Sequence, residues 1–303
     1  MTKNRGVAAE VLDETGLDVI KRAAVVAMFA DDDLMDILVL KGGNAMDLVH
    51  RVSSRASVDL DFSMKADLDH EAALPKLEKA LQRTFANHGY QAFDIHLKVR
   101  PGKMPDELAA FWGGYLVEFK LISQARAKEL DGNLEQMQRE AIKLGEGSKF
   151  TIDISRHEYI EDKEPHELDG YTIYVYSPMM IVCEKLRAIC QQMPAYGQVI
   201  QRSKPGTQRA RDFVDIEVLM RTFELDITSE SANLMLSEIF KAKHVPLSYL
   251  GVLRPNPRNF QIAKSADGLC PINPRQNSLQ VNRIALVSEG VVPQEMQVLP
   301  SCR

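Results

Sequence analysis

Two aspartates separated by one residue are the first candidates for chemistry in this sequence. Asp59 and Asp61 belong to the segment 58–63, where apolar and polar residues alternate, and this alternation predicts a β-strand. Side chains at positions i and i+2 of a strand point to the same face, so both carboxylates would lie together while Leu60 and Phe62 face the core. Convergent carboxylates suit Mg²⁺, which prefers oxygen ligands. A lone Asp-x-Asp pair is more often a surface feature, so its surroundings must support the assignment.

A glycine turn precedes this strand at Gly42-Gly43-Asn44. Glycine lets the backbone approach a phosphate closely, and the N–H groups at the start of a following helix can bind that phosphate. Asn44 could cap the helix and donate its side-chain amide to the phosphate. Taken alone, a plain tight turn explains the two glycines equally well. Together the turn and the acids suggest two-metal nucleotidyl transfer, in which two ions about 3.5–4 Å apart bridge the reacting oxygens.

The elements expected to position these residues form an α+β fold. We predict helices over 7–30, 45–52, 70–88 and 130–144, and strands over 58–63, 92–99, 114–122, 149–154 and 171–176. The apolar segment 34–40 fits either a short strand or a helix end. We interpret the acidic run at 31–33 as a solvated helix end.

The second half of the chain is predicted to be mostly helical. Ser177-Pro178 is a typical helix start, followed by helices to about 193, over 209–223 and over 230–243, with a loop at 194–207. After residue 250 prolines are frequent and periodicity is weak. We therefore expect a mixed sheet with flanking helices in a catalytic domain at 1–176, a helical domain at 177–250 that completes the cleft, and an irregular tail at 251–303.

Composition narrows the function classes. The chain has 303 residues, of which 45% are hydrophobic and 26% charged, as in ordinary globular proteins. No apolar run approaches the roughly 20 residues of a membrane span, and the start of the chain lacks a secretory h-region, so we expect a cytoplasmic protein without a membrane partner. The four cysteines form no CxxC pair, which argues against a zinc site.

The overall charge gives little support to a surface that binds nucleic acid throughout. The net charge is −5 and the pI about 5.9. The segment 202–211 is locally basic, however, and contains no acidic residue. It is either a solvated connector or a patch that contacts phosphate or RNA.

Three motifs in order resemble the AbiEii-type nucleotidyltransferases, the toxins of type IV toxin–antitoxin systems. This family is related to the MenT toxins and to the DNA polymerase β-like superfamily. The resemblance covers residues 41–216. Its motifs are Lys-Gly-Gly-Asn-Ala (41–45) followed by Arg-Ala-Ser-Val-Asp-Leu-Asp-Phe (55–62), Glu-Lys-Leu-Arg-Ala (184–188) and Arg-Asp-Phe-Val-Asp-Ile (211–216).

The resemblance implies a role for each matching residue. Asp59 and Asp61 would hold two Mg²⁺ ions, or Mn²⁺, with Asp153 as the third carboxylate and Glu118 as its competitor. Lys185 would face the triphosphate, and Asp212 would orient Lys185 or the nucleotide. The implied nucleotide-binding residues are Gly42, Gly43, Asn44, Arg55, Ser57 and Lys185. Arg211 and Asp215 are expected to form a structural ion pair.

The implied reaction moves a nucleotide from an NTP to an acceptor hydroxyl, with the 3′ end of tRNA as the expected acceptor and an antitoxin as a possible partner. Two departures from the family pattern concern the pocket. Asn44 stands where the family usually has Ser or Thr after the glycines. Ala56 stands where the family usually has an aromatic or apolar residue, and Val58 stands where it often has an acid. The alternatives are a small-molecule nucleotidyltransferase of the antibiotic-modifying kind and an inactive domain that binds a nucleotide or a partner protein.

Overall fold

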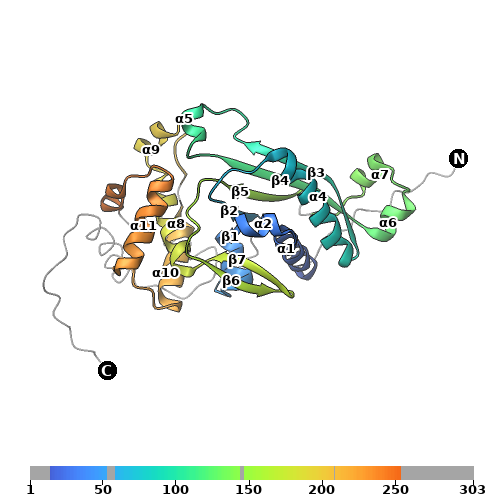
Figure 1. Ribbon diagram of the computed structural model, residues 1–303, viewed down its shortest axis with the longest axis horizontal. Helices are drawn as coiled ribbons and strands as arrows, with labels where there is room; N and C mark the ends of the chain where they lie inside the picture. The colour runs from blue at the N-terminus through green and yellow to red at the C-terminus, as the bar shows by residue number, and fades with distance from the viewer. Residues whose placement is uncertain (1–13, 53–58, 144–146, 208, 254–303) are drawn as a thin grey trace, which may run out of the picture. The chain divides into compact units, whose positions relative to one another are not determined.

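The computed structural model describes residues 14–52, 59–143, 147–207 and 209–253. The chain divides into two compact units, Met1–Pro178 and Met179–Arg303. The first unit contains a seven-stranded mixed sheet with helices, and the described part of the second unit is helical (Figure 1). The predicted fold class, a mixed sheet with flanking helices followed by mostly helical structure, is confirmed.

The sheet has the strand order β3-β4-β5-β2-β1-β7-β6, so β2 is its central strand. Strand β2 is antiparallel to β1 and parallel to β5, and β1 is parallel to β7. The other neighbouring pairs are antiparallel. The strands are β1 (Val39–Lys41), β2 (Leu60–Ser63), β3 (Tyr90–Arg100), β4 (Gly114–Ser123), β5 (Phe150–Ser155), β6 (Lys163–Leu168) and β7 (Tyr171–Tyr176).

One face of the sheet is apolar and carries two helices, α1 (Glu14–Met28) and α4 (His70–Asn87), which also contact each other. Phe62 on β2 packs against Phe29 with ring centroids 5.8 Å apart, and Phe119 on β4 packs against Phe85 of α4 at 5.5 Å. Alternation along the strands sends Asp61 to the other face, away from these helices. The predicted division of β2 into a core face and a polar face is therefore present.

The acidic run begins a helix rather than ending one. Asp31 is the N-cap of α2 (Asp32–Ile37), and its carboxylate accepts a hydrogen bond from the Leu34 amide at 3.3 Å. Acids suit this position because the helix dipole is positive at its N-terminus. After α2 the chain enters β1, so the ambiguous segment 34–40 contains both a helix end and a strand.

Three other segments of this unit differ from the prediction. Of the expected helix at 130–144, the described residues form only the short helix α7 (Leu134–Arg139), and another short helix, α6 (Gln124–Glu129), precedes it; Asp131 and Gly132 between the two both have positive φ, which interrupts a continuous helix. Strand β6 was not predicted because its sequence, Lys-Glu-Pro-His-Glu-Leu, is charged and contains proline. Such a strand is tolerated at a sheet edge, where β6 lies. A short helix α5 (Asp106–Ala109) also precedes β4.

The second unit contains four helices and a final 3₁₀ turn in its described part. These are α8 (Pro178–Cys190), α9 (Pro194–Val199), α10 (Ala210–Thr222), α11 (Glu230–Ala242) and η2 (Leu247–Val252). Helix α9 lies in the expected loop and starts with proline at its first turn. Cys183 and Cys190 are both buried. Almost all of the predicted tail, 251–303, lies outside the described residues.

No helix within the described ranges combines the length and apolar character needed to span a membrane.

Candidate functional site

Three charged residues lie in one row across the middle of the sheet. Lys41 on β1 is the antiparallel register partner of Asp61 on β2, and Asp61 is the parallel register partner of Asp153 on β5. Register partners on neighbouring strands lie about 4.8 Å apart and point to the same face. Asp59 is exposed just before β2. The structure thus places the predicted third carboxylate, Asp153, directly beside Asp61.

The electrostatics of Asp153 show how close the other charges are. Partial burial raises the pKa of the Asp153 carboxyl, and the negative charge of Asp59 raises it further, while Arg100 and Lys41 lower it. The guanidinium Nη1 of Arg100 lies 4.0 Å from Asp153 Oδ1. The carboxylates repel one another, and the surrounding cations offset part of that repulsion.

Glu118, the competing candidate for the third carboxylate, belongs to a different group. It lies on β4 opposite Thr151, whereas the residue opposite Asp153 is Leu116. Its carboxylate binds the ammonium groups of Lys98 and Lys149. Asp153, and not Glu118, is therefore the strand acid beside Asp61.

The carboxylates near Asp61 have the chemistry that suits a hard divalent cation. Asp59, Asp61 and Asp153 supply only carboxylate oxygens, the ligands that Mg²⁺ prefers. In the described part of the chain, no three His, Cys, Asp or Glu side chains already converge closely enough to hold one ion. The acids are brought to one region by the register of β2 and β5, and closer convergence would require their side chains to move.

The glycine turn lies against this acid pair. Gly42 has φ +68°, and a Cβ atom there would lie only 2.9 Å from Asp61 Oδ2. Only glycine meets both conditions, because other residues are strained at positive φ and would crowd the carboxylate. Gly42 and Gly43 open the short helix α3 (Gly42–Asn44), which continues into the π-helical turn η1 (Ala45–Val49). The turn thus presents bare backbone beside Asp61.

Asn44 does not have the predicted capping role. The residue preceding α3 is Lys41, and no side chain caps this helix. Asn44 is instead fully buried, and its Nδ2 donates a hydrogen bond to the backbone carbonyl of Asp59 at 2.5 Å. Its Oδ1 is a buried acceptor without a hydrogen-bond partner in the described structure. The predicted helix cap is wrong, and the amide instead binds the backbone just before β2.

Lys41 is a site residue that the sequence reasoning missed. Its side chain is buried, donates a hydrogen bond to Ser155 Oγ at 3.2 Å and lies 3.6 Å from Glu158 Oε1. A buried ammonium is costly unless it is paired with an acid, so Glu158 stabilises it. The sequence feature that could have identified Lys41 is its position directly before the two glycines. Glu158 carried no local signal, because its approach to Lys41 depends on the sheet.

The second unit contains a buried ion cluster. Lys185 Nζ on α8 lies 3.1 Å from Asp212 Oδ1 and 2.7 Å from Asp215 Oδ2, both on α10. Burial lowers the pKa of Lys185, but the attraction of the two aspartates outweighs it and raises the pKa overall. Arg209 also binds Asp212. The expected pairing of Asp215 with Arg211 is wrong, because Asp215 binds Lys185 and Arg211 is exposed.

The basic segment 202–211 is partly engaged within its own unit. Arg202 donates to the backbone carbonyls of Gln191, Gln192 and Met193 at 3.1–3.4 Å, beyond the end of α8. Arg209 binds Asp212, whereas Lys204 and Arg211 are exposed. The predicted nucleotide-binding residues Arg55 and Ser57 lie outside the described residues.

Comparison with known proteins places the chain in a family. The family model described as "Nucleotidyl transferase AbiEii toxin, Type IV TA system" matches residues 24–281. No curated protein matches the chain. Among solved structures, an antigenic nucleotidyltransferase-like protein from Paracoccidioides brasiliensis is 15% identical over 80% of this chain and 97% of its own, with a TM-score of 0.36.

The family match spans most of the chain and includes the glycine turn, the strand acids and the Lys185 cluster. The chain therefore belongs to the AbiEii family of nucleotidyl transferase toxins of type IV toxin–antitoxin systems.

Proposed function

We propose that this protein is a Mg²⁺-dependent enzyme that transfers a nucleotide from an NTP to an acceptor hydroxyl. The observation that carries the proposal is the pairing of Asp61 with Asp153 on adjacent strands, beside a glycine turn that leaves bare backbone at the carboxylates. Family membership supports the reaction class.

Asp59, Asp61 and Asp153 would hold the metal ions, with Mn²⁺ as a possible replacement. Bound there, the ions would neutralise the charge that develops on the transferred phosphate and the leaving pyrophosphate. Asn44 fixes the backbone at Asp59, and Lys41 supplies a buried positive charge next to the acid row. Gly42 and Gly43 allow phosphate oxygens to approach the backbone.

The helical unit would contribute Lys185 and Asp212. An ammonium with two carboxylate partners is held in one orientation and kept charged, which suits a group that balances charge on a triphosphate. In this proposal Asp212 and Asp215 position Lys185. Arg55 and Ser57 would complete the nucleotide contacts, as the family pattern implies.

The proposed acceptor is the 3′ end of tRNA, whose modification would block translation and arrest growth. The description of the family as a type IV toxin supports a target of this kind and a cognate antitoxin partner. A reaction between NTPs and tRNA belongs in the cytoplasm.

The test is incubation of the pure protein with Mg²⁺, each labelled NTP and bulk tRNA. Label on tRNA that is abolished by EDTA is the expected result. Transfer to an aminoglycoside but not to tRNA would show the small-molecule activity instead. NTP binding without transfer to any acceptor would contradict an enzymatic role.

A further inference from the structure

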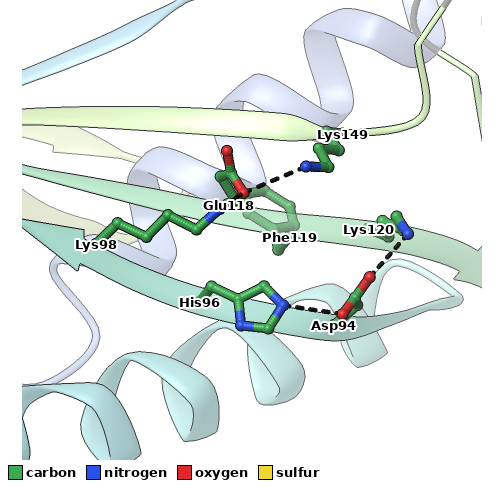
Figure 2. A pocket seen from close by; sticks show the side chains of 7 residues that line it. All are labelled: Asp94, His96, Lys98, Glu118, Phe119, Lys120 and Lys149. Atoms are coloured by element: carbon green, nitrogen blue, oxygen red, sulfur yellow. Dashed lines mark hydrogen bonds and ion pairs between the residues drawn. The ribbon is translucent and has the colours of Figure 1, made fainter.

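A charged pocket of about 90 Å³ lies on the first unit, away from the row that contains Asp61. It is lined by Asp94, His96, Lys98, Glu118, Phe119, Lys120 and Lys149. Figure 2 shows Lys98 and Lys149 approaching Glu118 from two sides, and Asp94 between His96 and Lys120. The lining comes from β3 and β4 and from the residue before β5, so three separate stretches of sequence form it.

A β-bulge in the edge strand shapes one side of the pocket. The pairing of β3 with β4 shifts between Phe93 and His96, and Asp94 in the bulge has φ +54°. Bulges redirect side chains. Here the Asp94 carboxylate lies 2.7 Å from Lys120 Nζ and 3.0 Å from His96 Nε2.

The pocket holds more positive than negative charge. Three lysines face two carboxylates, and the carboxylate of Glu118 is shared by Lys98 and Lys149. Hydrogen bonding from Lys98 lowers the pKa of Glu118, and hydrogen bonding from Lys120 lowers that of Asp94. Both acids therefore stay ionised at neutral pH, and the three lysine ammonium groups exceed the two carboxylates by one positive charge, which remains for an anionic ligand.

The pocket shares a face of the sheet with the metal-site acids. Lys98 on β3 is opposite Leu116 on β4, which is opposite Asp153 on β5, which is opposite Asp61 on β2. With about 4.8 Å between strands, the backbone of Lys98 lies roughly 14 Å from that of Asp61. This spacing is within reach of the last few nucleotides of an RNA whose end is at Asp61.

Arg100 joins the two regions. It follows Lys98 at the next position on the same face of β3, and its guanidinium reaches Asp153 across β4, where the residue opposite it is Gly114. Basic side chains therefore continue from the pocket to the carboxylates.

We propose that this basic face, formed by Lys98, Arg100, Lys120 and Lys149, binds the phosphodiester backbone of the RNA acceptor just upstream of its 3′ hydroxyl. The inference rests on the proposed function. Phosphate oxygens would take the place of Glu118 as partners of Lys98 and Lys149. The acceptor then crosses the edge strand β3 with its 3′ end directed toward Asp61 and Asp153.

The test measures tRNA binding at several salt concentrations for two variants, one that removes positive charge from the pocket and one that removes negative charge. Lys98→Gln/Lys149→Gln is expected to weaken binding and to reduce the salt dependence of log K by about 0.7 for each phosphate that the variant no longer binds. Glu118→Gln frees both lysines and is expected to tighten binding. Lys76→Gln/Lys79→Gln on α4, which packs on the other face, removes the same charge and is expected to leave the salt slope unchanged.

Unchanged tRNA affinity in both pocket variants would overturn the proposal. The lysines would then serve only to prevent the edge of the sheet from pairing with another chain. Weaker binding in Glu118→Gln would also contradict it, since the carboxylate would then support binding. NTP affinity, measured in parallel, is expected to stay the same in all variants. If the wild-type protein labels no RNA, the proposed function fails. If it labels RNA but the pocket variants bind tRNA normally, only the basic face fails.

Discussion

Gly42 and Asp61 are so close that a methyl group on the glycine would lie 2.9 Å from the Asp61 carboxylate oxygen. We predict that Gly42→Ala lowers stability by about 1–2 kcal/mol through backbone strain and also displaces Asp61, so that nucleotide transfer is nearly lost. Gly170→Ala is the matched control, because Gly170 has φ +81° but no atom within 4 Å of an added Cβ. Thermal unfolding and transfer assays of both variants separate strain from displacement. Equal loss of transfer in the two variants would contradict the role of the close approach.

Asn44 is predicted to position Asp59. Asn44→Ala removes the hydrogen bond to the Asp59 carbonyl, at an expected cost of about 1–3 kcal/mol, and should raise the Mg²⁺ concentration needed for half-maximal transfer. Asn233→Ala, which removes hydrogen bonds to Thr228 and Ser229 in the second unit, is the control. A variant that lost stability but kept its Mg²⁺ requirement would show a structural role alone.

The assignment of the third carboxylate predicts opposite results for two conservative substitutions. Asp153→Asn should reduce transfer by about three orders of magnitude, because several kcal/mol of charge stabilisation depends on the metal ions. Glu118→Gln should retain transfer, because Glu118 binds Lys98 and Lys149. Steady-state rates at saturating tRNA, with circular dichroism to check folding, provide the measurement. The reverse pattern would make Glu118 the metal ligand.

The Lys185 cluster predicts a specific pH dependence. Lys185→Met leaves Asp212 and Asp215 without this buried cation and should lower stability by about 3–5 kcal/mol. The pKa of Lys185 is raised in the folded state. Its contribution to the free energy of unfolding is therefore complete below the pKa of an unfolded lysine, about 10.4, and is lost as the pH rises through the pKa of the folded state. The stability difference between wild type and variant should therefore be constant between about pH 6 and pH 9. Denaturant unfolding across this range provides the check, with exposed Lys204→Met as the control. A difference that declined below pH 9 would contradict the pairing.

Arg202 is predicted to be structural. Arg202→Gln removes hydrogen bonds to carbonyls beyond the end of α8 and should lower stability by about 1–2 kcal/mol. Lys204→Gln, a neighbouring exposed substitution, should not. Neither should approach the effect of Lys98→Gln/Lys149→Gln on tRNA affinity. If Arg202→Gln weakened tRNA binding without loss of stability, the segment 202–211 would be an RNA contact after all.

The sequence predicted most of the sheet because its strands alternate clearly. The segments at 92–99, 114–122, 149–154 and 171–176 correspond to β3, β4, β5 and β7 within one or two residues at most ends. Strand β6 was missed because its charged residues and proline leave no clear alternation of apolar and polar residues. Helix α9 was missed because it is only six residues long.

The candidate site was predictable only as far as local patterns extend. Asp59, Asp61 and the glycine turn carry a motif, but the position of Asp153 beside Asp61 depends on the parallel pairing of β2 with β5, about 90 residues apart. The role of Asn44 was misjudged because its partner is a backbone carbonyl, which no sequence pattern reveals. The basic face was not visible for a similar reason, since its residues come from three separate stretches of sequence, β3, β4 and the residue before β5, and are brought together only by strand pairing.

The order of the strands places the proposed metal-binding acids and the proposed RNA-binding residues on different parts of the sheet. Strand β2, with Asp61, is fourth of the seven strands, while β3, with Lys98 and Arg100, is at the edge. Substitutions on a strand with a partner on one side only disturb fewer neighbours than those at the centre. Under the proposed function, evolution could therefore change the nucleic acid that the edge strand accepts, while selection keeps the interior of the sheet fixed for the reaction.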